Sequence, residues 1–207
     1  MRWGSMFAAG VLLGLCGLVG EAKAAPPADR DRRCLAMIAY AEAANEGALG
    51  MLAVMRVVHN RIADRSFADD ACAVVLQRGQ FQPVSEQPSL RQAMARPETA
   101  NLAQAVGANT REARLRLVEA WRLAAVAAVW PARDPTGGAL YFVNPRLMNP
   151  DLCPWFAKLK RSAVIGEHVF MRDYGPGEAK AAPALACARA AAARSPAPRP
   201  ATRVAAR

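Results

Sequence analysis

Apolar residues recur at helical spacing over residues 31–46, which predicts a first helix there. Its inward stripe consists of Leu35, Ile38 and Ala39. The next position on that stripe is Glu42, a carboxylate where an apolar residue is expected. A second carboxylate, Glu46, follows one turn later, near a helix end that Gly47 can terminate. The pattern therefore predicts two acids on one helix edge, with Glu42 either facing the core or reaching solvent at the margin of the stripe.

A second helical pattern covers residues 48–64, so close to the first that the two helices should pack together. Arg56, Asn60 and Arg61 occupy faces of this helix other than the core stripe. The core stripe is made by Leu52, Met55, Val58 or His59, and Ile62.

Two further helices are predicted with a polar cap at their start. Residues 71–78 form a short helix that Asp69 or Asp70 can cap. Residues 110–130 form a long helix that Thr110 can cap, suited to the centre of an α-rich domain. Its inward residues are Leu117, Val118, Trp121, Ala125 and Ala128.

The remaining segments predict loops and a small β element. Residues 79–88, GQFQPVSEQP, form a polar loop that can carry a site. The other segments are weak helices at 89–95 and 98–104, a β-prone run at 139–143, one helical turn at 154–160, and a last strand at 164–171 with Gly166 near its start. Together these patterns predict a mainly α domain with a small β element and no internal repeat.

The N-terminal residues have the features of an export leader. Arg2 precedes an apolar run, and Ala22 and Ala24 are small residues where a signal peptidase reads them, so residues 1–24 predict a cleaved signal peptide. Residues 25–33 then form a linker. A lipoprotein processed at Cys16 and an uncleaved membrane anchor are the alternatives, disfavoured by the large Leu15 and by the short apolar run. We expect export to the periplasm or the medium.

Export permits disulfides among the four remaining cysteines, which are Cys34, Cys72, Cys153 and Cys187. Pairing of Cys34 with Cys72 is favoured because both lie at predicted helix starts, whereas Cys187 lies in the tail. Free buried thiols are the alternative.

Half of the net charge of +10 lies at the C-terminus, since residues 175–207 hold six Lys and Arg and the single acid Glu178. This Ala, Pro and Arg segment has too few large apolar residues to fold, and predicts a disordered tail. The tail could contact an anionic envelope polymer or membrane surface. Nucleic acid is disfavoured as a partner, because an exported protein is separated from the nucleic acid of the cell and because no aromatic residues lie among the basic ones.

Several reaction types lack the residues they need. With only His59 and His168 and no HExxH motif, a His-rich zinc site lacks ligands, and no GxSxG motif is present. A Cys72–His168 pair would require a free thiol in an oxidising compartment. Carboxylate chemistry remains, because a buried carboxyl such as Glu42 can keep its proton near neutral pH. Glu46 lies too near along the same helix to serve as the opposite carboxylate of a glycosidase pair.

Four segments together resemble the SleB/CwlJ-type cell wall hydrolases, over residues 34–174. The segments are AYAEAANEGALGMLAVMRVVHNRI, FADDACAVVLQRGQFQP, DPTGGALYFVNP, and Trp155 with IGEHVF. The resemblance implies a lysozyme-like catalytic domain that acts on peptidoglycan as a monomer without metal or cofactor. It implies Glu42 as general acid and base, and Glu46 as a carboxylate that either meets the substrate or supports the residues that do. The other substrate-side residues that it implies are Asn60, Gln80, Phe81, Thr136, Gly137, Gly138, Tyr141, Asn144, Trp155 and His168.

Two departures from the family pattern affect this expectation. Ala44 and Asn45 replace an Arg-Gly pair of the family motif, and the loop after Phe81 lacks an extra Cys pair. The missing Arg could loosen the positioning of Glu42. The predicted reaction is cleavage of the muramic acid to glucosamine bond by the lytic transglycosylase route; the alternatives are an N-acetylmuramoyl-L-alanine amidase and a non-catalytic peptidoglycan-binding module. As the simpler structural alternatives, His168 and the aromatic residues pack in the core and the two glycines make a turn.

Overall fold

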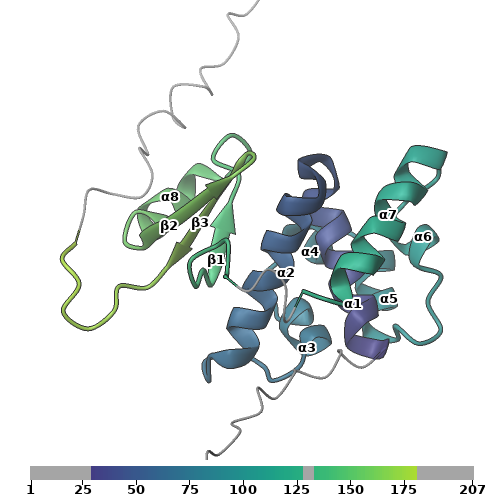
Figure 1. Ribbon diagram of the computed structural model, residues 1–207, viewed down its shortest axis with the longest axis horizontal. Helices are drawn as coiled ribbons and strands as arrows, with labels where there is room; N and C mark the ends of the chain where they lie inside the picture. The colour runs from purple at the N-terminus through teal and green to yellow at the C-terminus, as the bar shows by residue number, and fades with distance from the viewer. Residues whose placement is uncertain (1–28, 128–132, 181–207) are drawn as a thin grey trace, which may run out of the picture.

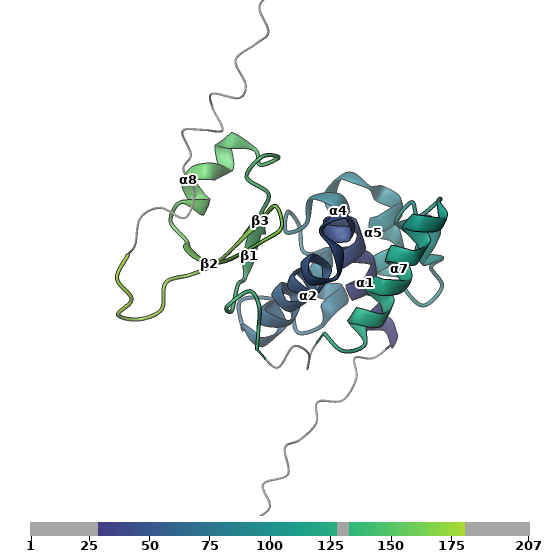
Figure 2. The same ribbon diagram turned by 45° about the horizontal axis from the view of Figure 1, so that its top comes forward.

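The computed structural model describes residues 29–127 and 133–180; the predicted leader and most of the predicted tail lie outside this part. Its helices are α1 (Asp29–Ala43), α2 (Gly47–Ala63), α3 (Ala71–Leu76), α4 (Gln82–Glu86), α5 (Pro88–Ala95), α6 (Leu102–Ala105), α7 (Arg111–Ala124) and α8 (Cys153–Phe156). Two 3-10 turns are η1 (Ala44–Glu46) and η2 (Pro150–Leu152), and the strands are β1 (Tyr141–Val143), β2 (Lys160–Ile165) and β3 (His168–Arg172). The helices α1–α7 gather on one side and the sheet lies beside them (Figures 1 and 2). The prediction of a mainly α fold with a small β element is confirmed.

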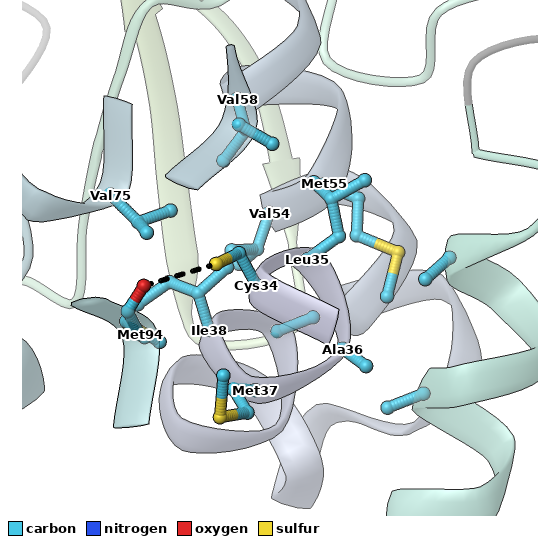
Figure 3. Close-up of a cluster of buried hydrophobic side chains, with 14 of the residues drawn as sticks. Cys34, Leu35, Ala36, Met37, Ile38, Val54, Met55, Val58, Val75 and Met94 are labelled. Atoms are coloured by element: carbon cyan, nitrogen blue, oxygen red, sulfur yellow. Dashed lines mark hydrogen bonds between the residues drawn. The ribbon is translucent and has the colours of Figure 1, made fainter. Parts of the chain in front are cut away.

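Helix α1 forms the centre of the helical part. All six residues from Cys34 to Ala39 are fully buried, so this helix is covered on every side. Their side chains meet Val54 and Met55 of α2, Val75 of α3 and Met94 of α5 (Figure 3). The prediction that residues 110–130 supply the central helix is therefore wrong. Because α1 is apolar or small all round this segment, it is the helix that can be enclosed.

The first helix begins earlier than predicted, inside the expected linker of residues 25–33. The polar side chains of its first turns are held at the surface by partners: Arg33 bonds Asp29 one turn earlier at 3.1 Å, and Arg30 bonds Asp70 at 3.0 Å. Arg32 donates to the carbonyl of Trp121 at 3.0 Å and stacks 3.8 Å above its ring. The contacts of Arg30 and Arg32 are long-range, and the charged start of α1 has no apolar periodicity that would reveal it.

Helix α7 starts as predicted, because the Thr110 hydroxyl accepts the Ala113 N–H at 3.1 Å. Its buried stripe is Leu117, Ala120 and Ala124. Val118 was predicted to face inward but is 44% exposed, which is a correction, and the predicted end at Trp130 falls outside the described residues. Helix α7 packs on α1 through the small Ala120 and Ala124, and Val118 lies at the edge of this contact.

A disulfide joins α1 to the start of α3. Cys34 and Cys72 are bonded at 2.07 Å, as the sequence favoured, and Cys153 is disulfide-bonded as well. The Asp70 carboxylate caps α3 by accepting the Ala73 N–H at 2.7 Å. Both features fix α3 beside the N-terminal half of α1. No helix among the described residues is both long and apolar enough to cross a bilayer.

The sheet is antiparallel, with strand order β1-β3-β2. The prediction of one last strand over residues 164–171 is wrong, because the chain reverses at Gly166 and Glu167 between β2 and β3. Gly166 has a φ of +56°, which suits the first central position of a two-residue hairpin turn. The sheet packs on α2 through a small buried cluster of Ala53, Val57, Ala139 and Phe170.

Ordered contacts continue past the predicted domain end at residue 174. The Glu178 carboxylate accepts from Arg172 at 2.7 Å, from Lys160 at 2.7 Å and from the Gly175 N–H at 2.9 Å. The hydrogen bond from Arg172 is the largest of the effects that hold the pKa of Glu178 well below its usual range. The segment after β3 is thus tied back to β2 and β3, so the first residues of the predicted tail, 175–178, make defined contacts.

Candidate active site

A cleft of about 900 Å³ lies where the helical part meets the sheet. The end of α1 with η1 and the segment through α4 border it on the helical side; β1, the segment through η2 and α8, and the start of β3 border it on the other. Most polar residues of its wall carry amide or hydroxyl groups: Asn45, Gln80, Gln82, Ser85, Gln87, Asn144 and Asn149. Such groups suit the hydroxyl and acetamido groups of a sugar chain.

Glu42 lies on this wall, near the C-terminal end of α1, and its side chain is half-buried. Burial raises the pKa of Glu42 to about 7; the charge of Arg61 partly offsets this, and the charge of Glu86 adds to it. At neutral pH a large share of this carboxyl group therefore holds its proton. That is the state a general acid needs.

The two acids do not share one helix edge, which corrects the sequence prediction. Helix α1 ends at Ala43, and Glu46 lies in the 3-10 turn η1 before Gly47, whose φ is +70°. The tighter turn sends the Glu46 carboxylate to the β2–β3 turn, where its Oε2 accepts the Glu167 N–H at 3.0 Å. Glu42 and Glu46 both border the cleft, but Glu42 belongs to the α-helix α1 and Glu46 to the 3-10 turn η1.

Arg61 is an electrostatic neighbour of Glu42, and its sequence position predicted a place off the core stripe of the second helix. It is only 2% exposed. Its Nε donates to the Leu140 carbonyl at 2.7 Å, and its guanidinium lies 5.0 Å from the Phe81 ring and 5.2 Å from the Phe67 ring. Burial lowers the pKa of Arg61 to about 10, so it stays charged. Its spacing of i+3 from Val58 could have placed it on the core stripe.

The segment DPTGGA forms a turn fixed to α2. The Asp134 carboxylate accepts from the Thr136 N–H at 2.8 Å, the Thr136 hydroxyl at 2.7 Å and the Gly138 N–H at 2.9 Å. Asn60 of α2 donates to Asp134 at 2.9 Å and to the Ala139 carbonyl at 3.0 Å. These hydrogen bonds lower the pKa of Asp134 although burial opposes them. Asp134 was not singled out from the sequence, but an Asp two residues before a Thr-Gly-Gly run is a turn signal.

The residues of this DPTGGA turn are not part of the cleft wall that the described residues form. Thr136 is fully buried, and Gly137 and Gly138 have φ values of +64° and +79°, as their turn role predicts. With Asn60, these residues hold β1 against α2. Their contact with substrate stays a prediction.

We expect Asp134→Ala to lower the free energy of unfolding by about 2–4 kcal/mol, because the N–H and the hydroxyl of the buried Thr136 and one N–H of the half-buried Asn60 lose their acceptor. Asp64→Ala is a matched control, since that exposed carboxylate accepts locally from Ser66 and should cost less than about 1 kcal/mol. Urea denaturation measures both. Equal losses for the two variants would show that the turn does not anchor β1.

The predicted aromatic residues lie beside the cleft rather than on its described wall. Phe81 is 1% exposed and packs in the helical core. Tyr141 and Trp155 meet edge to face with ring centroids 4.9 Å apart, and Tyr141 donates to Asp173 at 3.5 Å. Trp155 is 44% exposed, so a role as a sugar platform stays a prediction for this residue.

Four predicted substrate-side residues do reach the same cleft wall as Glu42. They are Glu46, Gln80, Asn144 and His168. The His168 ring is 6% exposed, lies 5.3 Å from the Phe142 ring, and has a buried Nδ1 with no hydrogen-bond partner. Burial lowers the pKa of His168, with Glu46 and Glu167 opposing it. A mostly neutral His with an unused buried nitrogen thus borders the cleft.

One cluster of metal-ligand types occurs among the described residues, formed by Asp31, Asp70 and Cys72. The Cys72 sulfur is bonded to Cys34, and Asp70 caps α3 while pairing with Arg30. These atoms are committed to the fold, so the cluster does not fit a metal.

A family model described as Cell Wall Hydrolase matches residues 45–171, a range that begins just after Glu42. Solved structures that resemble the chain include the catalytic domain of the germination-specific lytic transglycosylase SleB from Bacillus anthracis, with 23% identity, a TM-score of 0.45, and coverage of 70% of this chain and 96% of that one. The catalytic domain of the Bacillus cereus SleB protein also matches, with 23% identity, a TM-score of 0.47, and coverage of 70% and 92%. No curated protein matches significantly.

Proposed function

Because the chain belongs to the cell wall hydrolase family, we propose that it cleaves peptidoglycan glycan strands between N-acetylmuramic acid and N-acetylglucosamine, with Glu42 as the general acid and base. The observation that carries this proposal is a half-buried carboxyl group with a pKa of about 7 on the wall of an amide-lined cleft. Leaving-group protonation needs such a group.

In the first step the neutral Glu42 carboxyl donates its proton to the glycosidic oxygen as the bond from that oxygen to C1 of the muramic acid breaks. The substrate's own acetamido oxygen can stabilise the positive charge that develops at C1. In the second step the Glu42 carboxylate removes the proton of the 6-hydroxyl group, whose oxygen bonds to C1. The product is a 1,6-anhydro sugar, and Glu42 regains its proton.

A hydrolytic route is the second candidate, and Glu86 is the observation that favours it. This α4 residue borders the same cleft as Glu42, and its charge raises the pKa of Glu42. A second carboxylate of this kind could activate a water molecule in place of the 6-hydroxyl group. The Glu86 Oε1 accepts a hydrogen bond from Gln82 at 2.7 Å. To activate a water molecule, Glu86 would have to release Gln82 or accept from the water in addition to Gln82.

The products formed from purified sacculi test this proposal. We expect mass spectrometry of the soluble fragments to show muropeptides ending in 1,6-anhydromuramic acid. Ordinary reducing ends would replace the transglycosylase route with hydrolysis. Freed stem peptides would instead identify an amidase, and binding to sacculi without any release would identify a binding module.

The same proposal includes the location and partners of the protein. Peptidoglycan lies outside the cytoplasm, so the chain would act after export, in the periplasm or the medium, as a monomer. The predicted basic tail would hold it near anionic envelope polymers. The cleft carries its own carboxylates, so the tail and the cleft would favour different chemical groups of the envelope.

A further inference from the structure

Glu46 is enclosed by two glycines that come from different parts of the fold. A Cβ atom at Gly50 of α2 would overlap the Glu46 Cβ, and a Cβ atom at Gly166 of the β2–β3 turn would overlap its Oε2. Any other residue at either position would displace the Glu46 side chain. Gly50 therefore makes room for the start of the Glu46 side chain, and Gly166 makes room for its carboxylate.

The carboxylate joins the two sides of the cleft. Its Oε2 accepts the Glu167 N–H at 3.0 Å, which links η1 of the helical side to the hairpin turn of the sheet side. The other described contacts of the sheet side with α2 lie outside the two turn residues: Asn60 and Arg61 donate to the carbonyls before β1, and Ile165 at the end of β2 packs against the cluster around Phe170. The turn is directly followed by His168, the cleft residue whose buried Nδ1 has no partner.

From this geometry we propose that Glu46 is a positioning residue, which clips the β2–β3 turn to the end of α1 and thereby holds His168 on the cleft wall. This inference rests on the proposed function, in which the cleft binds the glycan strand. The resemblance left open whether Glu46 meets the substrate or acts from behind the residues that do, and this geometry favours the second role. The clip requires an acceptor oxygen at Glu46 and the absence of a side chain at Gly166.

Variants of the full-length protein separate these requirements. Glu46→Ala removes the acceptor, Glu46→Gln keeps an oxygen acceptor, and Gly166→Ala places a Cβ where the carboxylate lies. We expect Glu46→Ala and Gly166→Ala each to raise KM for a soluble glycan-strand fragment by about tenfold, with kcat changed by less than about threefold, because Glu42 is untouched. Glu46→Gln should stay within about threefold in both constants.

The combination Glu46→Ala/Gly166→Ala is the sharpest test. With the carboxylate gone, the added Cβ has nothing to displace, so the double variant should resemble Glu46→Ala rather than show the product of both effects. Additive losses would overturn the proposal. The proposal would also be overturned if Glu46→Gln were as impaired in KM as Glu46→Ala while its hairpin turn stayed in place. A direct contact of Glu46 with the substrate would then explain the loss.

Two matched controls isolate the clip from general damage. Gly107→Ala introduces Ala at a similar φ of +67° with nothing within 4 Å, so it reports backbone strain alone and should leave KM unchanged. Glu167→Ala keeps the backbone donor while it removes the exposed ion pair with Arg146, and should also be neutral.

Amide hydrogen exchange gives a readout that does not need activity. We expect the Glu167 amide to exchange at least about tenfold faster in Glu46→Ala than in the wild type, and at nearly the wild-type rate in Glu46→Gln. Unchanged protection of this amide in Glu46→Ala would overturn the clip even if the protein proves to have a different substrate. If the wild type does not cleave glycan strands but the Glu167 amide exchanges faster in Glu46→Ala, the proposed function is overturned and the role of Glu46 in holding the turn is kept.

Discussion

Glu42→Gln is expected to lower kcat for glycan cleavage by about 10³-fold, with KM changed little. The amide has nearly the shape of the carboxyl group, so cleft geometry and substrate binding should persist. It cannot give up a proton to the glycosidic oxygen or take one from the 6-hydroxyl group. Release of soluble muropeptides from sacculi, measured as a rate, checks this.

The pH dependence of the wild type should carry the same signature. The pKa of Glu42 is raised to about 7, so the protonated acid is present below that pH and is lost as the pH rises through it. We expect kcat/KM to fall on the alkaline side with an apparent pKa near 7. This limb should be absent from the residual activity of Glu42→Gln.

Glu86→Gln is the informative control for this assignment. The charge of Glu86 raises the pKa of Glu42, so its removal should move the alkaline limb to lower pH while activity at acidic pH persists. Under the hydrolytic route, Glu86→Gln would lose activity at every pH. Retention of more than a tenth of the wild-type rate by Glu42→Gln would contradict a role for Glu42 as the acid.

The sequence could predict Glu42 because one helical stripe continued into a carboxylate, a local signal within a single element. Arg61 and Asp134 were harder to find, since their importance comes from contacts across the fold. The Arg61 guanidinium lies near the rings of Phe67 and Phe81, which belong to segments that follow α2 in the chain. Asp134 holds a turn together and accepts a hydrogen bond from Asn60 of α2. Periodicity reports which face of a helix is apolar, but not which distant loop will cover it.

The hairpin shows the opposite limit, where a local signal was present and was assigned to the wrong structure. Gly166 lies within a run of β-forming residues, and a strand that tolerates an interior glycine is a possible interpretation. A two-residue turn beginning with glycine is the alternative that the structure adopts. The consequence is functional, because the reversal places Glu167 against Glu46 and brings His168 to the cleft.

The cleft itself could not be derived from the order of the motifs. Its walls come from segments that are far apart in sequence, with Glu42 and Gln80 on one side and Asn144 and His168 on the other. These four residues, which the resemblance to a family had grouped, line this one cleft. The resemblance also grouped them with Thr136 and Trp155, whose described contacts lie in the turn and in the aromatic cluster beside the cleft. A shared motif therefore mixes residues that build the scaffold with residues that face the cleft.

Removal of the Cys34–Cys72 disulfide is expected to lower the free energy of unfolding by about 4 kcal/mol. The bond joins residues separated by 38 positions, and a cross-link over a loop of that length restricts the unfolded chain strongly. It also fixes the first turns of α1, the helix whose far end carries Glu42. Cys34→Ala/Cys72→Ala, followed by urea denaturation, measures the loss.

The single variants distinguish the cross-link from the packing of the two buried sulfurs. Cys34→Ala and Cys72→Ala each break the same bond, so each should cost nearly as much as the double variant. Losses that add from the two single variants to the double would instead reflect two independent cavities, because each buried sulfur would then contribute through its own contacts. If the double variant remains within about 1 kcal/mol of the wild type, the N-terminal half of α1 is held by its apolar enclosure alone, and Glu42 does not depend on the disulfide for its position.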